Sequence, residues 1–143
     1  MPTLQKEIKI KAPLEEVFAY LTKPANLPQI WPSLYEVKDV QTLPKGGHSF
    51  MWLFNFAGHQ VKGTIETAEY VPNERIVDKA VGDVESTCAW TFYGDNGTTE
   101  VTFKADYEFP ERFIPRDEKP FAVRWTELEA EYLLTNLKAK LEV

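Results

Sequence analysis

The sequence predicts an α+β fold in which a curved antiparallel sheet of six or seven strands lies against one long C-terminal helix. The middle of the chain is a series of alternating apolar and polar segments joined by short turns, and strands joined in this way pair antiparallel. Residues 118–141 contain no glycine and only Pro120, which the first turn of a helix tolerates. At roughly 1.5 Å per residue this helix would be about 36 Å long, enough to cross a small domain.

The first elements of the chain are a strand and two short helices. Residues 3–11 alternate apolar and polar side chains, which predicts a strand. Pro13 then opens a helix, and Glu15 and Glu16 suit the positive end of its dipole. A second helical turn is expected over residues 25–30, between prolines. We therefore place both helices between the first strand and the rest of the sheet.

Six further strands are expected after the second helical turn. They are separated by glycine, proline, asparagine and aspartate, and their ranges are 35–42, 49–57, 61–71, 75–81, 84–93 and 99–109. In most of them apolar residues alternate with polar ones, so one face of the sheet is expected to be covered and the other wet. The strand over 49–57 differs, because it is apolar on both faces.

The long helix is expected to present an aromatic stripe to the sheet. Phe121, Trp125, Leu128 and Tyr132 recur at the spacing of one helical face. A helix with such a broad face, lying across a curved sheet, either fills the concavity or leaves a hollow. The stripe therefore makes the contents of that concavity the main question about function.

Composition excludes several classes of protein. With 143 residues, 43% of them hydrophobic, one domain over residues 1–143 is expected. No segment approaches the roughly 20 apolar residues of a membrane span, so stable membrane insertion is not expected. A net charge of −6 disfavours binding to nucleic acid. A single cysteine, Cys88, and an N-terminal segment without the apolar centre of a signal peptide predict a cytoplasmic protein.

No catalytic residue, metal site or cofactor is predicted. The chain has no nucleophile elbow and no phosphate-binding glycine loop. His48 and His59 are expected in surface turns, and with one cysteine they are too few for a zinc site. The carboxylates in strands are expected to be solvated, and they are Glu36, Asp39, Glu69 and Asp78.

A ligand cavity lined by aromatic side chains is predicted instead. Most aromatic stripes form a packed core, and that is the alternative here. Trp, Tyr and Cys also line apolar pockets, where they add an occasional polar group. The candidate ligand-binding residues are Trp31, Tyr35, Trp52, Phe54, Phe56, Ile65, Cys88, Trp90, Phe103, Tyr107, Phe121, Trp125 and Leu128.

Several short motifs resemble those of the START-like superfamily, also called SRPBCC, which has a helix-grip fold. They are segments 10–18 and 24–32, the Gly46-Gly47 turn with Phe50 and Trp52, Gly63 with Glu66, and segments 70–72 and 97–99. The resemblance covers nearly the whole chain and is nearest to the polyketide cyclase/dehydrase-like branch. It implies that an apolar molecule binds between the sheet and the long helix. Nothing matches the iron ligands of the hydroxylase branch.

The favoured interpretation is a protein that binds a hydrophobic small molecule, such as a lipid, an isoprenoid or a polyketide, for transport or sequestration. One alternative is a cyclase or dehydratase-like enzyme that uses a pocket carboxylate or tyrosine. Another is a protein-interaction module, although the sequence indicates no particular protein partner. The superfamily contains carriers, enzymes and co-chaperones, so the fold alone does not decide between them. An apolar pocket favours carriage, buried convergent carboxylates favour catalysis, and a solid core with an exposed apolar patch favours the module.

Overall fold

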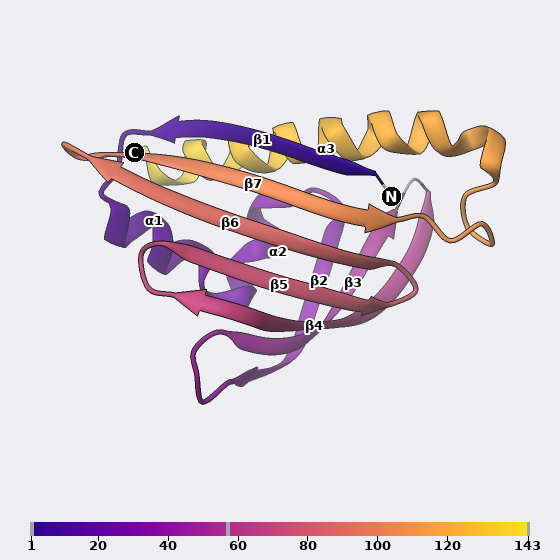
Figure 1. The fold of residues 1–143 in the computed structure, drawn as a ribbon, viewed down its shortest axis with the longest axis horizontal. Helices are drawn as coiled ribbons and strands as arrows, with labels where there is room; N and C mark the ends of the chain where they lie inside the picture. The colour runs from indigo at the N-terminus through magenta and orange to yellow at the C-terminus, as the bar shows by residue number, and fades with distance from the viewer. Residues whose placement is uncertain (1, 57, 143) are drawn as a thin grey trace.

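Seven antiparallel strands form one sheet in the order β1-β7-β6-β5-β4-β3-β2 in the computed structural model, which describes residues 2–56 and 58–142. The strands are β1 (Thr3–Ile10), β2 (Leu34–Thr42), β3 (His48–Phe56), β4 (His59–Val71), β5 (Arg75–Gly82), β6 (Glu85–Asp95) and β7 (Thr98–Glu108). The helices are α1 (Leu14–Leu21), α2 (Leu27–Ile30) and α3 (Lys119–Leu141), with 3-10 turns η1 (Pro24–Asn26) and η2 (Arg116–Glu118). The predicted architecture is confirmed, with seven strands (Figure 1).

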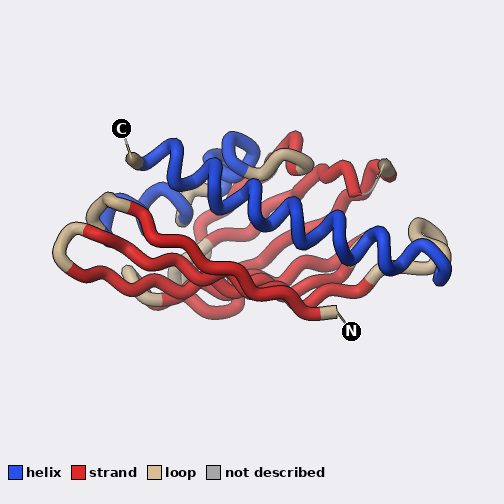
Figure 2. The backbone as a smooth tube through the Cα atoms, turned by 90° about the horizontal axis from the view of Figure 1, so that it is seen from above, coloured by secondary structure: helices blue, strands red, loops and turns tan. Residues whose placement is uncertain are grey.

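The helices all lie on the same side of the curved sheet. Figure 2 shows α3 running along the sheet, with the shorter helices near its C-terminal end. In contacts between elements, α3 meets β1 at one edge of the sheet and also meets α2, while α1 meets β6 and β7. The sheet therefore wraps around the helices, and its inner face forms the core.

The first helix anchors one end of this core. Pro13 stands directly before α1, and its carbonyl accepts the Val17 N–H at 3.1 Å. The sequence predicts Pro13 inside the first turn of the helix, whereas in the structure it stands one position before the first helical residue. Phe18 is buried, and its ring meets those of Tyr70 and Phe92 edge to face, with centres 5.5 and 5.2 Å apart. This cluster ties α1 to β4 and β6.

The predicted aromatic stripe of α3 is wrong in its phase. Phe121 is 66% exposed and Tyr132 is 57% exposed, while Leu128 is half-buried and stands outside the core cluster. The helix face that packs inward carries Ala122, Ala130, Leu133, Leu134 and Leu137. Small and branched aliphatic side chains let the helix approach the sheet closely, and the large rings of Phe121 and Tyr132 are left on the solvent side. Only Trp125 of the expected stripe packs against the core.

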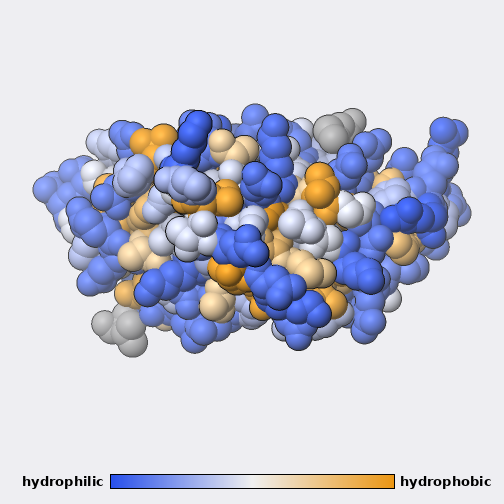
Figure 3. All heavy atoms as spheres, turned by 90° about the horizontal axis from the view of Figure 1, so that it is seen from below, coloured by the Kyte–Doolittle hydropathy of each residue, from blue (hydrophilic) through white to orange (hydrophobic). Residues whose placement is uncertain are grey.

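The outer face of the sheet carries apolar and polar residues side by side. Met51 and Leu53 on β3 are half-buried there, in keeping with the apolar character of this strand on both faces. Figure 3 shows the molecule from below, and apolar residues on this face alternate with hydrophilic ones. The functional geometry therefore has to be sought on the inner face.

Phe18→Ala should lower the free energy of unfolding by about 3–5 kcal/mol, because it empties a buried aromatic position that three elements share. Urea unfolding followed by tryptophan fluorescence measures the loss. Tyr93→Ala is the matched control, since Tyr93 is 68% exposed and its removal should change stability by less than about 0.5 kcal/mol. A loss below about 1 kcal/mol for Phe18→Ala would contradict the position of α1.

Candidate functional site: an aromatic cavity under the long helix

A cavity lies between the inner face of the sheet and the N-terminal half of α3. It offers about 120 Å³ to the centre of a water-sized sphere, and it is partly open to the outside. One water needs roughly 10–15 Å³ by this measure, so the space exceeds what isolated waters fill. Its wall draws on β1, α2, all the later strands and α3. The concavity is therefore only partly filled by side chains.

Most of the residues predicted to bind a ligand lie on this wall. The structure brings together Trp31, Trp52, Phe54, Phe56, Ile65, Cys88, Trp90, Phe103, Tyr107 and Trp125. Their phase follows from the alternation along each strand, which puts every second side chain on the inner face. The alternation along the strands therefore predicts which strand residues line the cavity, independently of the phase of the helix.

Three predicted residues lie away from the cavity. Phe121 and Leu128 belong to the helix face that turns away from it. Tyr35 is 50% exposed, because β2 has a register shift between Leu34 and Glu36 and Leu34 takes the inward position. A bulge of this kind sends the extra residue to the other face of the sheet. These three positions are therefore corrections to the sequence prediction.

The aromatic rings of the wall hold one another in place. Trp31 meets Phe54 and Phe103 edge to face, with ring centres 5.8 Å apart in both pairs. Trp125 meets Phe56 at 5.5 Å and Phe54 at 6.3 Å, which joins α3 to β3. Each such contact adds about 0.5–1.5 kcal/mol beyond the area it buries. The interlocked rings keep the space open because none can turn into it freely.

Gly63 makes room for Trp52. The two residues face each other across β3 and β4, and a Cβ at Gly63 would come within 2.7 Å of the indole Cζ2 and would also collide with the Val81 carbonyl. The indole ring therefore lies against the backbone of Gly63, with no side chain between them. Its Nε1 is buried and has no hydrogen-bond partner among the described residues. Gly63 thus sets how deep the cavity is beside Trp52.

Asp78 is a carboxylic acid on the cavity wall. It is paired across the sheet with Thr67 on β4 and Cys88 on β6. Thr67 Oγ1 donates a hydrogen bond of 2.8 Å to Asp78 Oδ1 and accepts the His48 N–H at 3.0 Å. Burial raises the pKa of Asp78, and the hydrogen bond from Thr67 opposes that shift only in part.

The expectation that Asp78 is solvated is wrong. Glu36, Asp39 and Glu69 are exposed as expected, whereas Asp78 is half-buried and lines the cavity. The sequence contained the signal, because Asp78 shares its strand face with Ile76 and Ala80, both buried. A carboxylate in phase with apolar residues is a candidate for a functional group.

Glu129 is a second acidic residue on the wall, and sequence reasoning missed it. Only 8% of it is exposed, and its Oε1 accepts the Ser33 N–H at 2.7 Å. It stands four residues after Trp125, hence on the same helical face. Further along α3, the side-chain amide of Asn136 donates to the Ile30 carbonyl at 2.9 Å. Glu129 and Asn136 therefore tie α3 to the loop around α2.

Two further polar side chains face the cavity. Tyr107 is buried, and its hydroxyl lies near Thr126 without forming a hydrogen bond of ordinary geometry. Burial raises the pKa of Tyr107, and the negative charge of Glu127 raises it further. The Cys88 thiol has its pKa raised to about 12, first by burial and then by the charge of Asp78. Both groups are therefore uncharged at neutral pH.

A metal site does not emerge from this geometry. Over residues 2–56 and 58–142, no three His, Cys, Asp or Glu side chains gather as ligands. His48 is half-buried at the start of β3, and His59 is exposed at the start of β4. In the same described part of the chain, no helix is both long and apolar enough to cross a membrane.

A family model described as polyketide cyclase/dehydrase and lipid transport matches residues 1–142. Among proteins with curated functions, none is similar enough in sequence to count as a match. The sequence likeness is therefore to the family as a whole.

Solved structures share the arrangement over nearly the whole chain. A START superfamily protein from Mycobacterium smegmatis has a TM-score of 0.83 at 14% identity, covering 98% of this chain and 97% of its own. An aromatase/cyclase from Streptomyces has the same score and identity, covering 99% and 93%. A protein from Thermus thermophilus has a TM-score of 0.74 at 22% identity, covering 98% and 97%. At these identities the likeness is one of fold, and the fold is START-like.

Asp78→Asn should be at least as stable as the wild type at pH 7. The pKa of Asp78 in the folded protein lies above its ordinary value of 3.8, so the free energy of unfolding falls as pH rises between the two values and stays lower above them. Asparagine removes this titration and keeps an oxygen for Thr67.

Urea unfolding at several pH values between about 4 and 8 measures the effect. The advantage of Asp78→Asn should shrink toward the acid end of this range, whereas Asp39→Asn, at an exposed carboxylate, should show no such trend. If Asp78→Asn is less stable than the wild type at pH 7 by more than about 1 kcal/mol, the Thr67 hydrogen bond outweighs the cost of burial.

Cys88 should react slowly with thiol reagents in the folded protein. The thiolate is the reactive form, and a pKa of about 12 leaves almost none of it at pH 8. Reaction with a disulfide reagent, followed by absorbance with and without urea, should be at least about a hundredfold slower in the native state. Fast reaction of the native protein would show that the cavity wall opens readily at β6.

Proposed function

Because the chain belongs to the polyketide cyclase/dehydrase and lipid transport family, we propose that it binds a hydrophobic small molecule between the sheet and α3, for transport or sequestration. The observation that carries the proposal is the cavity itself, which interlocked aromatic rings line and hold open. A preformed apolar hollow of this kind is what a small-molecule site requires. The function proposed is binding, and a lipid, an isoprenoid or a polyketide is the expected class of ligand.

The energy of such binding would come from removing apolar surface from water. Each Å² of apolar surface buried contributes about 25 cal/mol. The rings of Trp31, Trp52 and Trp125 present flat apolar faces from three different elements, so a planar or branched ligand could contact several at once. The interlocked rings lower the ordering cost on binding, since their positions are already set.

The volume limits the ligand. A cavity of about 120 Å³ suits a compact molecule of one or two rings or a short branched chain. A longer molecule would have to protrude through the open side. Compact aromatic or isoprenoid ligands are therefore better candidates than long-chain lipids held entirely inside.

An enzyme of the cyclase or dehydratase kind is the second candidate, and Asp78 is the observation that favours it. A carboxyl group whose pKa is raised by burial suits proton transfer near neutral pH. Tyr107 supplies a hydroxyl on the same wall. A carrier releases its ligand unchanged, so mass spectrometry of a ligand before and after incubation separates the two candidates.

The interaction module has less support. Its expected sign is a solid core with a contiguous exposed apolar patch, and this core is hollow. The large apolar side chains that are exposed are spread over β2, β5, β6 and α3, and they are Tyr35, Val40, Val81, Tyr93, Phe121 and Tyr132.

Trp125→Ala should weaken binding of a fluorescent apolar probe by about 1–3 kcal/mol, because it removes a ring that forms part of the cavity wall. Probe titration measures the dissociation constant, and circular dichroism confirms that each variant is folded. Phe121→Ala is the matched control, since it removes an aromatic ring from the same helix on the solvent side. Equal losses in both variants would contradict the site, and a wild-type protein that binds no apolar probe would contradict the proposed function.

Native mass spectrometry of freshly purified protein would test the same proposal without a chosen probe. A bound apolar molecule that is absent from Trp125→Ala and present in Phe121→Ala would support it.

A further inference from the structure

The cavity wall carries carboxylic acids and no base. Among the described residues that line it, Asp78 and Glu129 are acidic, and none is lysine, arginine or histidine. We propose that the cavity selects apolar molecules that carry a basic amine, with the ammonium group paired to Asp78, and that it rejects apolar carboxylates. This inference rests on the proposed binding function and adds to it the charge of the ligand.

Asp78 lacks a positive partner within the described part of the protein. Its Oδ1 accepts the Thr67 hydroxyl, and neither of its oxygens takes part in any ion pair described for residues 2–56 and 58–142. Oδ2 has no hydrogen-bond partner there and is not enclosed by protein atoms. The second oxygen is thus open to a partner, and Asp78 lines both the cavity and a smaller pocket beside it.

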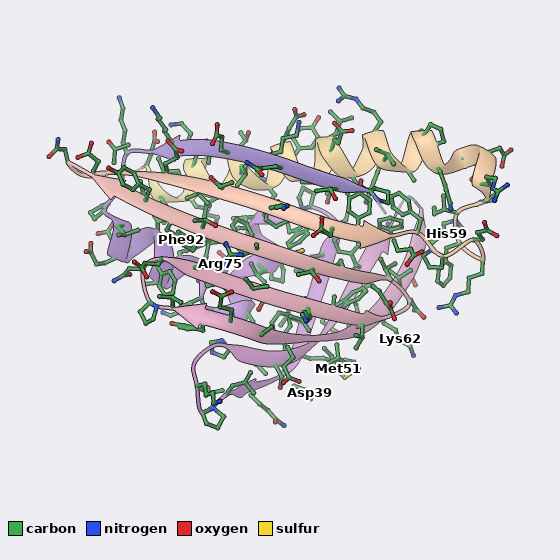
Figure 4. All side chains as sticks on the ribbon, viewed as in Figure 1. Asp39, Met51, His59, Lys62, Arg75 and Phe92 are labelled. Carbon is green, nitrogen blue, oxygen red and sulfur yellow. The ribbon has the colours of Figure 1, made fainter. Side chains whose placement is uncertain are left out.

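The strand alternation keeps nearby bases away from Asp78. Arg75 and Lys79 lie on the same strand, β5, but at the opposite phase, so they project from the outer face. Figure 4 shows Arg75 and Lys62 on that outer side of the sheet, and Arg75 pairs there with Glu69 and Thr91. His48 is the nearby exception, since it lines a second, smaller pocket together with Asp78 and Thr67. Burial lowers the pKa of His48 and so favours its neutral form.

Further polar atoms surround the same corner of the cavity. In the sheet register Asp78 is opposite Cys88, while Ser86, two residues before Cys88, is opposite Tyr107. Ser86 is therefore a diagonal neighbour of Asp78, at roughly 7–8 Å between backbones, within reach of one polar group placed between the side chains.

An ammonium group fits this corner better than any other charged group. It has three N–H donors and no acceptor, and the corner offers a carboxylate oxygen of Asp78 and the Ser86 hydroxyl oxygen. A charge-assisted hydrogen bond to a carboxylate is roughly twice as strong as one between neutral groups. A ligand carboxylate would instead face Asp78 and Glu129 across a medium of low dielectric constant, where like charges repel strongly.

Glu129 contributes to the field of the cavity, but it is not the expected contact. Its Oε1 accepts the Ser33 N–H, much as Asp78 Oδ1 accepts the Thr67 hydroxyl, but it approaches the cavity from α3, on the wall opposite Asp78 and Ser86. Its charge therefore adds to the repulsion of anions, while the specific pairing falls to Asp78.

Three ligands with one carbon skeleton test the proposal directly. They are naphthalen-2-ylmethanamine, naphthalen-2-ylmethanol and 2-naphthoate, which at pH 7 are a cation, a neutral molecule and an anion. Calorimetric titration of the full chain should give the tightest binding for the amine, by at least about tenfold over the alcohol, and the weakest for the naphthoate. Naphthoate that binds as tightly as the amine, or an alcohol that matches the amine, would overturn the proposal.

The variant Asp78→Asn tests whether Asp78 causes the preference for the amine. In this variant the amine should bind no more tightly than the alcohol, while the alcohol should keep its wild-type affinity within about threefold. Asp39→Asn is the matched control, because it removes one negative charge at an exposed site and should leave the order of the three ligands unchanged. An unchanged ratio of amine to alcohol affinity in Asp78→Asn would overturn the role of Asp78.

The outcomes separate this inference from the function on which it rests. If the alcohol and a neutral fluorescent probe bind but the amine has no advantage, the charge selection fails and the apolar site stands. If none of the three ligands and no probe binds, both fail. The wild-type order is informative even if Asp78→Asn does not fold, and Asp78→Ser then serves as a second variant.

Discussion

A straight helix cannot follow a curved sheet along its whole length, and this mismatch shapes the rest of the structure. The sheet has seven strands and bends around α3, which meets the sheet mainly along β1 and also contacts the short helix α2. Between these contacts the backbones separate, and only long side chains reach across. Trp31, Trp52 and Trp125 do so from three elements, and the space that they leave is the cavity.

The same mismatch explains why aromatic and aliphatic residues divide the core between them. Where α3 runs close to the sheet, alanine and leucine pack, as at Ala122, Leu133 and Leu137. Where the surfaces diverge, rings interlock edge to face, and the absence of a side chain at Gly63 lets the Trp52 indole lie deeper. The core is therefore closely filled at these positions of α3 and in the Phe18 cluster, while space remains around Trp125. The hollow costs contact energy that a fully packed core would have recovered.

The strands were predictable from the sequence and the phase of the helix was not. Side chains along a strand alternate every two residues, and this pattern can be recognised from very few residues. The inner faces of β3, β6 and β7 therefore follow directly from their alternation. In α3 the spacing of the large rings of Phe121 and Tyr132 predicts the wrong inward face. Close packing of a helix on a sheet favours small residues, and the alanines mark the face that packs. Tyr35 was misplaced for another reason, because a bulge in β2 is a local feature of hydrogen bonding with no sequence marker here. Asp78 is in phase with buried neighbours on its strand. Its position therefore indicates a side chain that faces the core, whereas its residue type alone predicts a solvated one.

The polar groups of the cavity are divided unevenly between its two walls. Asp78, Ser86, Cys88 and Tyr107 stand on adjacent strands, where the hydrogen-bonded register fixes their spacing, while α3 adds Glu129 with its carboxylate already bound to backbone. A rigid sheet is a precise place for recognition groups, and a helix that touches the sheet mainly at its edge can shift without disturbing them. Asp78 is a half-buried carboxyl group without a cationic partner among the described residues, and its partial desolvation disfavours the charged form unless a ligand or a proton completes the group. Under the two proposed functions, carriage of an amine and transfer of a proton would both depend on the unpaired oxygen of Asp78. They differ in whether the proton stays on the ligand, and this is set by the relative proton affinities of Asp78 and the bound group.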